Sequence, residues 1–410
     1  MSDAIHPSSS TVVVVGASLT GLRACETLRE EGFSGRLVLI GAEGHLPYDR
    51  PPLSKEILQG KWEADKIALR RGGLGDLELD FRRATRATAL DPASRIVTLE
   101  GGERLSYDGL VIATGARVRR LDMAEGFDGV HYLRTLEDAF ALRAQLEAVA
   151  QRGAPRVAVI GAGFIGCEVA SACRERDLDV TVIEPLAAPM VRALGRHLGG
   201  LAALLHRDNG VNLRCAAKLA AIEGDGRVER LRLGDGRTIA VDVLVVGVGV
   251  TAETSWLAGS GLELEDGVVC DERCSVGPGI VAAGDVARWK SLRRGGYRVR
   301  VEHWAHAGAQ GRAAALRLLR GADGVEPYDP VPYVWTDQFG IKIQMAGHPS
   351  PDDEVHLVDG AFDEYRFVAL FARGGRLTGV VGMRSSGLVM QYMAMLEEGV
   401  GIEQALTARF

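Results

Sequence analysis

The sequence predicts an α/β protein with two doubly wound dinucleotide-binding domains and an α+β C-terminal domain. A strand, a glycine-rich turn, a helix and a second strand follow one another twice along the chain, and each set is the start of a doubly wound sheet. Short strands replace this pattern after Asp323. We expect residues 11–118 and 247–323 to form the first binding domain, residues 119–246 the second and residues 324–410 the third.

The composition fits a folded chain with a large core. Of 410 residues, 47% are hydrophobic and 25% are charged, and the net charge of −6 argues against nucleic acid as the main partner. The polar segment Met1–Ser10 does not resemble a signal peptide, and no apolar run approaches the roughly 18 residues of a membrane helix. Six scattered cysteines are expected to stay reduced. We therefore expect a soluble, cytoplasmic protein.

The first dinucleotide unit opens with the apolar run Thr11–Val15, a predicted strand. A helical pattern then covers Leu22–Glu31, and Arg36–Ile40 is the second strand. Later strands of this unit are expected to end in small residues, with Gly109–Ala113 leading into Thr114 and Gly115, and Ile280–Ala283 leading into Gly284 and Asp285.

The second unit repeats the pattern. Its predicted elements are the strand Arg156–Ile160, the turn Gly161–Gly166, the helix Glu168–Arg176, the strand Val180–Glu184 and the strand Asp242–Val246, which leads into Gly247 and Gly249. The C-terminal domain is expected to contain the strands Lys342–Ala346, Phe367–Ala372 and Leu377–Met383 and the helix Leu388–Glu398.

The turn of the second unit has the full G-x-G-x-x-G pattern, with Phe164 and Ile165 at the variable positions. Gly161 permits the tight turn, Gly163 lets backbone N–H groups approach a pyrophosphate, and Gly166 lets the helix pack on the strand. Glu184 ends the next strand, where its carboxylate can accept both hydroxyls of an adenine ribose and would repel a 2′-phosphate. The pattern predicts NADH rather than NADPH, and a purely structural glycine turn is the alternative.

The turn of the first unit departs from the pattern. It consists of Gly16, Ala17, Ser18, Leu19, Thr20 and Gly21, with Ser18 at the position of the second glycine. Serine is small, so close approach of a ligand is hindered only slightly. Glu43 is the first carboxylate after the second strand. It is a candidate to bind a ribose, and the alternative is a solvated loop acid.

A proline-rich loop follows the first unit and delivers two cations. Its sequence, PYDRPPLSK, contains Arg50, which suits a pyrophosphate, and Lys55, which could reach a redox ring. An ordinary surface loop is the alternative, although its prolines would then rigidify it without evident reason.

The chain resembles the NADH-dependent, FAD-containing ferredoxin reductases of bacterial oxygenase systems, the putidaredoxin reductase family, which has the fold of disulfide-reductase-like flavoproteins. The resemblance runs from Thr11 to about Gln344 in the family's order. The similar stretches are VVVVGASLTGLRACETLR, LPYDRPPLSK, LVIATGARVRRL, YLRTLEDA, VAVIGAGFIGCEVA, IVAAGDVARW, VRVEHWAHAGAQGR and YVWTDQFGIKIQ.

The resemblance implies FAD in the first unit and NADH in the second. Gly16–Gly21 would hold the FAD pyrophosphate, Asp285 beside Gly284 the ribityl chain, and Trp304 would flank the isoalloxazine. Other residues that would line FAD are Lys55, Ala87, Ala113, Thr114, Gly115 and Arg134. Gly247 and Gly249 would lie by the nicotinamide pocket. The chain departs from the family at Ala42, where an acid is usual, and at Ala252 and Glu253, where Pro-Asn is usual.

The resemblance also implies an ion pair between Glu168 and Lys55 near the flavin, which would orient nicotinamide and tune flavin N5. Lys55, Glu168 and Trp304 are therefore the expected catalytic residues, acting by position. The alternative for Glu168 is an ordinary glutamate in the first turn of a helix.

The cysteines indicate where electrons leave. Disulfide reductases of this architecture carry C-x-x-x-x-C in the first helix, whereas this chain has only Cys25 there. Relatives that reduce peroxide or coenzyme A disulfide place a cysteine just after the second strand, but Gly41–Asp49 contains none. We expect electrons to leave singly to an external 2Fe-2S ferredoxin that serves an oxygenase. Ferredoxins are typically acidic, so a basic surface would favour docking, and a solvated loop is the alternative. The candidate docking residues are Arg288, Lys290, Arg293, Arg294, Arg298, Arg300, Arg312, Trp335 and Lys342.

The predicted reaction is hydride transfer from NADH C4 to FAD N5, followed by single-electron transfer to two ferredoxins, without a protein nucleophile or a metal. Two alternatives remain open. The first is an NADH-dependent flavoprotein with a quinone, nitrite or oxygen acceptor, and the second is a flavoprotein like apoptosis-inducing factor that acts mainly in binding or signalling.

Overall fold

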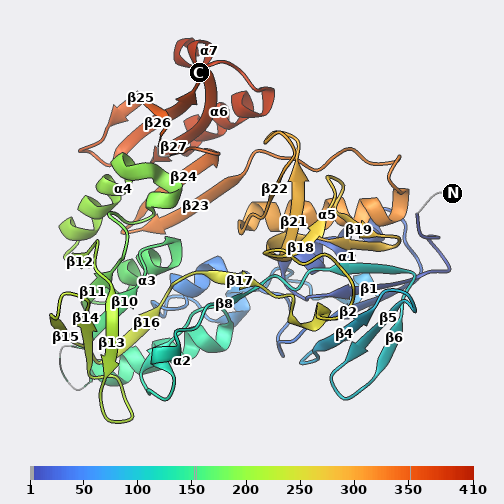
Figure 1. Cartoon of the computed structure of the whole chain (residues 1–410), viewed down its shortest axis with the longest axis horizontal. Helices are drawn as coiled ribbons and strands as arrows, with labels where there is room; N and C mark the ends of the chain where they lie inside the picture. The colour runs from blue at the N-terminus through green and yellow to red at the C-terminus, as the bar shows by residue number, and fades with distance from the viewer. Residues whose placement is uncertain (1–3, 152, 154, 351) are drawn as a thin grey trace. The chain divides into compact units, whose positions relative to one another are not determined.

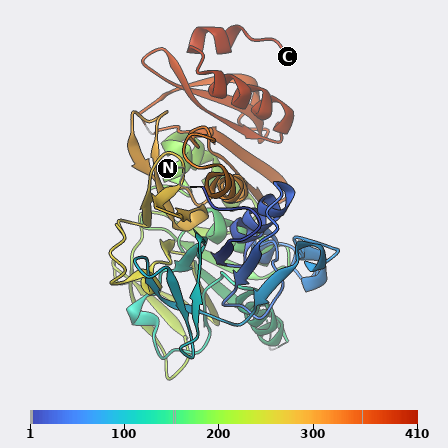
Figure 2. The same ribbon diagram turned by 90° about the vertical axis from the view of Figure 1, so that its right-hand side faces the viewer.

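The computed structural model describes residues 4–151, 153, 155–350 and 352–410, so the first three residues of the segment Met1–Ser10 lie outside it (Figures 1 and 2). The chain divides into two compact units. Unit 1 comprises Met1–Asp49, Ile67–Arg117 and Val250–Pro330, and unit 2 comprises Arg50–Lys66, Val118–Gly249 and Val331–Phe410. The predicted first binding domain falls largely in unit 1, and the other two predicted domains fall largely in unit 2. The predicted division into three domains stays a proposal.

Unit 1 is built on a six-stranded sheet in which only an edge strand is antiparallel. Its order is β19 (Ser275–Gly277), β20 (Ile280–Ala282), β7 (Gly109–Ile112), β1 (Thr11–Val15), β2 (Arg36–Ile40) and β3 (Leu79–Arg82). Strands β1, β2 and β7 are apolar on both faces because the sheet is covered on both sides.

Helices α1 (Leu19–Glu30) and α5 (Trp304–Arg320) cover one face of this sheet and pack on each other. A Cβ at Gly311 of α5 would lie 2.4 Å from the Thr20 carbonyl oxygen, so glycine permits the close approach of the two helices. The opposite face packs against two small sheets. They contain β4 (Ala87–Asp91), β5 (Ile96–Leu99) and β6 (Arg104–Ser106), and β18 (Val268–Cys270), β21 (Ala287–Ser291) and β22 (Tyr297–Val299).

Unit 2 begins with a second parallel sheet of five strands. Its order is β12 (Asn212–Arg214), β11 (Asp179–Ile183), β10 (Arg156–Ile160), β16 (Val243–Val246) and β9 (Val130–His131). One face packs against α2 (Leu136–Ala150), α3 (Phe164–Arg174) and α4 (Val191–Asp208). The other face packs against β13 (Leu219–Glu223), β14 (Arg230–Leu233) and β15 (Thr238–Ala240).

The C-terminal part of unit 2 is an antiparallel sheet. Its order is β23 (Tyr333–Gln338), β24 (Ile341–Gly347), β27 (Arg376–Met383), β26 (Arg366–Arg373) and β25 (Glu354–Ala361). In β26, Phe367, Ala369 and Phe371 face the core shared with α3 and α4, whereas Val368 and Leu370 face the helices α6 (Ser386–Glu398) and α7 (Ile402–Thr407), the red end of the chain in Figure 2. This alternation is the period of two of a strand covered on both faces.

The remaining elements are short. They are the 3-10 helices η1 (Pro51–Ser54), η2 (Ala64–Ile67), η3 (Gly75–Leu77), η4 (Asp122–Ala124), η5 (Ser255–Leu257) and η6 (Gly284–Val286) and the strands β8 (Ala116–Val118) and β17 (Val250–Ala252). No helix in the described part of the chain is both long enough and apolar enough to cross a membrane.

This architecture confirms the predicted fold class. Helices α1 and α3 begin at Leu19 and Phe164, earlier than predicted, because the last residues of each glycine-rich turn already form the first helical turn. Several elements were not predicted, among them helices α2, α4 and α7 and strands β23 and β25.

Candidate active site

The glycine-rich turn of unit 1 has the shape that a pyrophosphate requires. Gly16 has a φ of 119°, and a Cβ there would lie 2.0 Å from the Ala113 carbonyl oxygen. A Cβ at Gly21 would lie 1.8 Å from the Gly16 carbonyl oxygen. No side chain caps the N-terminus of α1, and Ala17 and Ser18 precede it, so its backbone N–H groups are oriented to bind an anion.

A second segment of unit 1 packs against this helix start. Gly284 has a φ of 77°, and a Cβ there would lie 2.4 Å from Thr20 Oγ1, so the turn that carries Asp285 closely approaches α1. The Gly284 N–H donates to Gln310 Oε1 of α5 at 2.7 Å. The structure therefore brings the predicted residues Thr20, Gly284 and Asp285 together beside the turn.

Glu43 lies in the loop after β2 and is partly buried. Its Oε2 accepts a hydrogen bond from the Tyr48 hydroxyl at 2.5 Å. This contact orients the carboxylate, which argues against a merely solvated acid and keeps Glu43 a candidate to bind a ribose.

Thr114 and Gly115, which follow β7, are both hydrogen-bonded to the backbone of Glu253. The Thr114 hydroxyl donates to the Glu253 carbonyl at 2.6 Å, and Glu253 N–H donates to the Gly115 carbonyl at 2.9 Å. Glu253 is one of the positions where the chain departs from the family, and it contributes backbone atoms here. Ala87 begins β4 and packs against the core on the side of the sheet away from α1 and α5.

Trp304 is the first residue of α5 and its indole is 38% exposed. Its Nε1 donates to Asp49 Oδ1 at 2.6 Å, which holds the ring in one orientation. No side chain caps this helix start either, and its first turn contains no acid. The exposed ring beside an uncapped helix N-terminus suits a flat, partly anionic ligand.

The glycine-rich turn of unit 2 has the same geometry. Gly161 has a φ of 96°, and a Cβ there would lie 2.3 Å from the Gly247 carbonyl oxygen. A Cβ at Gly166 would lie 2.0 Å from the Gly161 carbonyl oxygen, whereas a Cβ at Gly163 would have nothing within 4 Å. The closed side packs strand against helix, and the open side at Gly163 leaves space in which a pyrophosphate can approach the backbone.

Three further predicted residues lie in or after this turn. Phe164 and Ile165 form the first turn of α3, where Ile165 is 45% exposed and Phe164 is partly buried against the core. Gly249 has a φ of 97°, and its carbonyl accepts from the Arg119 N–H at 3.0 Å. These apolar and backbone groups could bind the uncharged parts of a dinucleotide.

Glu184 follows β11 and is buried against the glycine-rich turn. Its Oε2 accepts from the Ala162 N–H at 2.6 Å, and its Oε1 accepts from the Leu186 N–H at 2.8 Å. A carboxylate has about four acceptor positions, so about two remain for ribose hydroxyls. The residue thus joins the turn to the end of the next strand.

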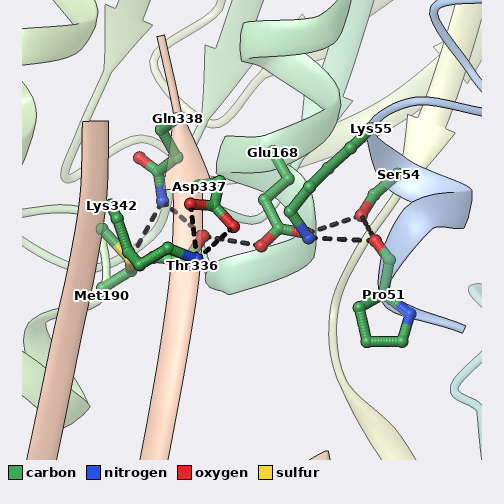
Figure 3. A network of polar contacts seen from close by, with 9 residues as sticks. All are labelled: Pro51, Ser54, Lys55, Glu168, Met190, Thr336, Asp337, Gln338 and Lys342. Carbon is green, nitrogen blue, oxygen red and sulfur yellow. Dashed lines mark hydrogen bonds and ion pairs between the residues drawn. The ribbon is translucent and has the colours of Figure 1, made fainter. Parts of the chain in front are cut away.

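The most buried polar cluster of unit 2 surrounds Glu168 of α3 (Figure 3). Glu168 Oε2 lies 2.9 Å from Lys55 Nζ and 2.5 Å from Ser54 Oγ, and its Oε1 accepts from Thr336 Oγ1 at 2.7 Å. The Lys55 and Glu168 side chains are only 11% and 4% exposed. A desolvated ion pair of this kind needs all of these partners.

Lys55 is held from a second side. Its Nζ donates to the Pro51 carbonyl at 2.9 Å, so η1 places both the lysine and the serine that contact Glu168. The ammonium group has three hydrogens, and two are used by these described contacts. One hydrogen remains for a ligand.

Arg50 and Arg134 also belong to unit 2. Arg50 Nη1 donates to the Arg134 carbonyl at 2.5 Å, and the Arg134 N–H donates to Asp138 Oδ2 at 3.0 Å. Asp138 and Thr135 form the capping box of α2. Arg50 and Arg134 are therefore brought together at the start of this helix.

The sequence did not point to Ser54 or Thr336 as site residues. Ser54 lies inside the quoted stretch PPLSK, so its position beside Lys55 was a usable signal. Thr336 lies in β23, far along the chain, and only its place beside Trp335 in a family-like stretch could have drawn attention to it.

All six cysteines are free, and five of them are buried. Burial raises the pKa of the Cys25 thiol to about 12 and raises that of Cys167 further. Such thiols are poor nucleophiles. The part of the chain around the site therefore offers no reactive dithiol.

The basic segment between Gly284 and Trp304 is partly neutralised by acids. Arg288 pairs with Glu265, Arg298 pairs with Glu263, and Arg300 pairs with Asp266 and Glu302. Lys290 and Arg294 are exposed. Arg293 donates to Asp329, Arg312 lies within 4 Å of Glu30 and Glu31, and Lys342 pairs with Asp337 near the Trp335 ring.

Comparisons with known proteins agree over nearly the whole chain. The model of the pyridine nucleotide-disulphide oxidoreductase family matches residues 10–311, and that of the reductase C-terminal family matches residues 333–409. Rhodocoxin reductase from Rhodococcus erythropolis is 35% identical over 374 residues, which cover 90% of this chain and 85% of that protein.

Two further comparisons cover similar lengths. The ferredoxin–NAD(+) reductase component of the p-cumate 2,3-dioxygenase system from Pseudomonas putida is 37% identical over 82% of this chain and 81% of that protein. The crystal structure of the covalent putidaredoxin reductase–putidaredoxin complex matches with a TM-score of 0.90 and 29% identity, covering 96% of this chain and 94% of that chain.

Proposed function

This chain belongs to the pyridine nucleotide-disulphide oxidoreductase family, and on that basis we propose that it is an FAD-containing NADH:ferredoxin oxidoreductase. Its partner is a 2Fe-2S ferredoxin that serves an oxygenase. The observation that carries this conclusion is the similarity to ferredoxin–NAD(+) reductase components over more than four fifths of the chain. The two glycine-rich turns, one in each unit, fit the two dinucleotides of this reaction.

For the first turn, we propose that Gly16, Ala17, Ser18, Thr20 and Gly21 bind the FAD pyrophosphate. The uncapped N-terminus of α1 supports this assignment, since it has N–H groups to donate and no acid in its first turn. The remaining proposed FAD-binding residues are Glu43, Arg50, Lys55, Ala87, Ala113, Thr114, Gly115, Arg134, Gly284, Asp285 and Trp304.

For the second turn, we propose that Gly161, Gly163 and Gly166 bind the NADH pyrophosphate and that Glu184 binds the adenine ribose. The two backbone N–H groups that already bind Glu184 keep its carboxylate in place for that role. The remaining proposed NADH-binding residues are Phe164, Ile165, Gly247 and Gly249.

Bound FAD would supply a two-electron acceptor for the NADH hydride and a one-electron donor for ferredoxin. The protein residues contribute position and charge. Glu168 fixes the Lys55 ammonium, whose remaining hydrogen can donate to a ligand. Asp49 holds the Trp304 indole, so that a flat ring can bind against it. None of these residues needs to exchange a proton with the substrate.

We further propose that the protein acts in the cytoplasm. All six cysteines are free, and no disulfide stabilises either unit. This is the usual state of thiols in a reducing compartment.

The test is a stopped-flow experiment on the purified protein. NADH should bleach the flavin absorbance much faster than NADPH, and a 2Fe-2S ferredoxin should then restore the oxidised spectrum. A protein that reduces a quinone or a dye well but no ferredoxin would have the alternative acceptor instead. Purified protein that binds no flavin would contradict the proposal altogether.

Docking has its own test. Lys290→Glu and Arg294→Glu reverse exposed charges in the basic segment, and they should raise the KM for ferredoxin at low salt without changing flavin reduction by NADH. Arg104→Glu in β6 is the matched control, because it reverses an exposed charge outside the basic segment. Equal effects of the three reversals would argue against this surface as the docking site.

A further inference from the structure

The Glu168 carboxylate is bound by a side chain from the C-terminal sheet. Thr336 of β23 is fully buried, and its hydroxyl donates to Glu168 Oε1 at 2.7 Å, on the oxygen that Lys55 and Ser54 do not contact (Figure 3). Lys55 and Ser54 both bind Oε2, so Thr336 provides the described contact that restrains the other end of the carboxylate. Without it, the carboxylate could rotate about its last bond.

Thr336 is itself oriented by a second buried residue. Gln338 Nε2 lies 3.1 Å from Thr336 Oγ1 and 3.5 Å from Met190 Sδ, and Gln338 Oε1 lies 2.9 Å from His206 Nε2. Burial lowers the pKa of His206, so the imidazole is neutral and carries one N–H. Sulfur is a weak acceptor, so the amide NH₂ of Gln338 is the group that faces Met190 and Thr336.

These contacts give the chain of hydrogen bonds one direction. His206 Nε2–H donates to Gln338, the Gln338 amide donates to Thr336, and the Thr336 hydroxyl hydrogen is left for Glu168. Each donor is polarised by the one behind it. This series of hydrogen bonds thus favours a single orientation of the Glu168 carboxylate.

Packing alone does not explain why two polar side chains of β23 are buried here. Thr336 and Gln338 are two residues apart on β23 and therefore face the same side of the sheet, toward α3. Both are completely buried. Burying two polar side chains on a face that could be apolar costs stability unless their hydrogen bonds are made.

We propose that Thr336 is a positioning residue for the reaction, which orients Glu168 and through it the Lys55 ammonium. The proposal rests on the proposed function of the Lys55–Glu168 pair beside bound FAD. It assigns the C-terminal sheet a part in flavin reduction beyond stabilising unit 2. Gln338 and His206 act behind Thr336, so their loss should have smaller effects.

The test compares three Thr336 variants of the FAD-loaded protein with one matched control and with Glu168→Gln. Thr336→Val keeps the size and removes the hydroxyl, Thr336→Ser keeps the hydroxyl, and Thr336→Ala removes the hydroxyl should valine not fold. The matched control is Thr378→Val in β27 of the same sheet, which removes a hydroxyl that donates to Asp353 at 2.7 Å.

In stopped flow, Thr336→Val should lower the limiting rate constant of flavin reduction by NADH about tenfold, with an unchanged dissociation constant for NADH. Thr336→Ser should restore the rate, and the control should leave it unchanged. A second readout does not use activity. Lys55 should react severalfold faster with acetic anhydride in Thr336→Val, as measured by peptide mapping, because the Glu168 carboxylate is no longer fixed against the Lys55 ammonium.

Glu168→Gln separates the two levels of the argument. The positioning role would be overturned if Glu168→Gln lowered the rate while Thr336→Val and Thr336→Ala left both the rate and the Lys55 reactivity unchanged. An unchanged rate in Glu168→Gln would instead overturn the proposed function of the ion pair. A loss shared equally by Thr336→Val, Thr336→Ser and Thr378→Val would show that the hydroxyl serves stability alone, which also overturns the proposal.

Discussion

The choice of NADH should depend on Glu184, and the structure sets the size of the effect. The carboxylate already accepts from the Ala162 and Leu186 N–H groups, which leaves about two acceptor positions for the 2′- and 3′-hydroxyls of a ribose. A hydrogen bond to a charged group contributes about 1.5–3 kcal/mol. Removing both should therefore cost at least about 3 kcal/mol, a factor of more than about one hundred.

NADPH should respond in the opposite direction. In the native protein its 2′-phosphate would meet a buried carboxylate, and two like charges about 4 Å apart repel by about 4 kcal/mol at an effective dielectric constant of about 20. Glu184→Ala removes that repulsion. Glu184→Ala combined with Pro185→Arg adds an attraction, since Pro185 is exposed beside it. The double variant should prefer NADPH.

The assay is dye-linked turnover with NADH and NADPH, read as the ratio of the two kcat/KM values. That ratio should fall at least a hundredfold in Glu184→Ala. The control is Glu175→Ala at the other end of α3, where the carboxylate is solvent-accessible and pairs with Lys61. A ratio that is the same in Glu184→Ala and Glu175→Ala would refute the assignment of Glu184 to the ribose.

Three other predictions concern stability and reactivity. Gly166→Ala places a Cβ 2.0 Å from the Gly161 carbonyl oxygen, so overpacking of about 1–3 kcal/mol should lower the thermal midpoint by several degrees, whereas Gly163→Ala, in open space, should keep it. N-ethylmaleimide at pH 7 should label Cys215, the one cysteine that is not buried, without loss of NADH-dependent dye reduction; inactivation would indicate a catalytic thiol. Burial, and to a lesser extent the neighbouring His303, lower the pKa of His306 to about 3. Between pH 6.5 and 3 the unfolded chain binds a proton that the native protein excludes, so the free energy of unfolding should fall by up to about 1.4 kcal/mol per pH unit on acidification. In His306→Gln the free energy of unfolding, measured by urea titration at several pH values, should depend less steeply on pH.

Local patterns explain how much of the fold could be predicted from the sequence. Strands β1, β2 and β10 have the predicted bounds, because each is an apolar run ended by a glycine or a polar residue. The glycines of both turns also act locally, through their own φ values and the carbonyl oxygens nearest to them. The ends of helices were less accurate because helical geometry begins within the turn itself.

The parts of the site that escaped prediction depend on contacts between distant segments. The sequence of β23, YVWTDQ, does not alternate between apolar and polar residues, so it gave no strand signal. Its buried residues Thr336 and Gln338 are polar, and their hydrogen bonds are made by side chains of α3 and α4. The basic segment shows the same limit. Its arginines looked like a positive surface in the sequence, but the acids of the loop Glu263–Asp266 fold back onto three of them.

The construction of unit 1 from three stretches of chain affects how it can be made. Strand β1 leaves the ribosome long before β20, which completes its sheet, and α5, which covers it, because both lie more than 250 residues later in the chain. The nascent chain must therefore keep an apolar half-sheet from aggregating while all of the parallel sheet of unit 2 emerges. Strand β1 is therefore buried only long after it has been translated.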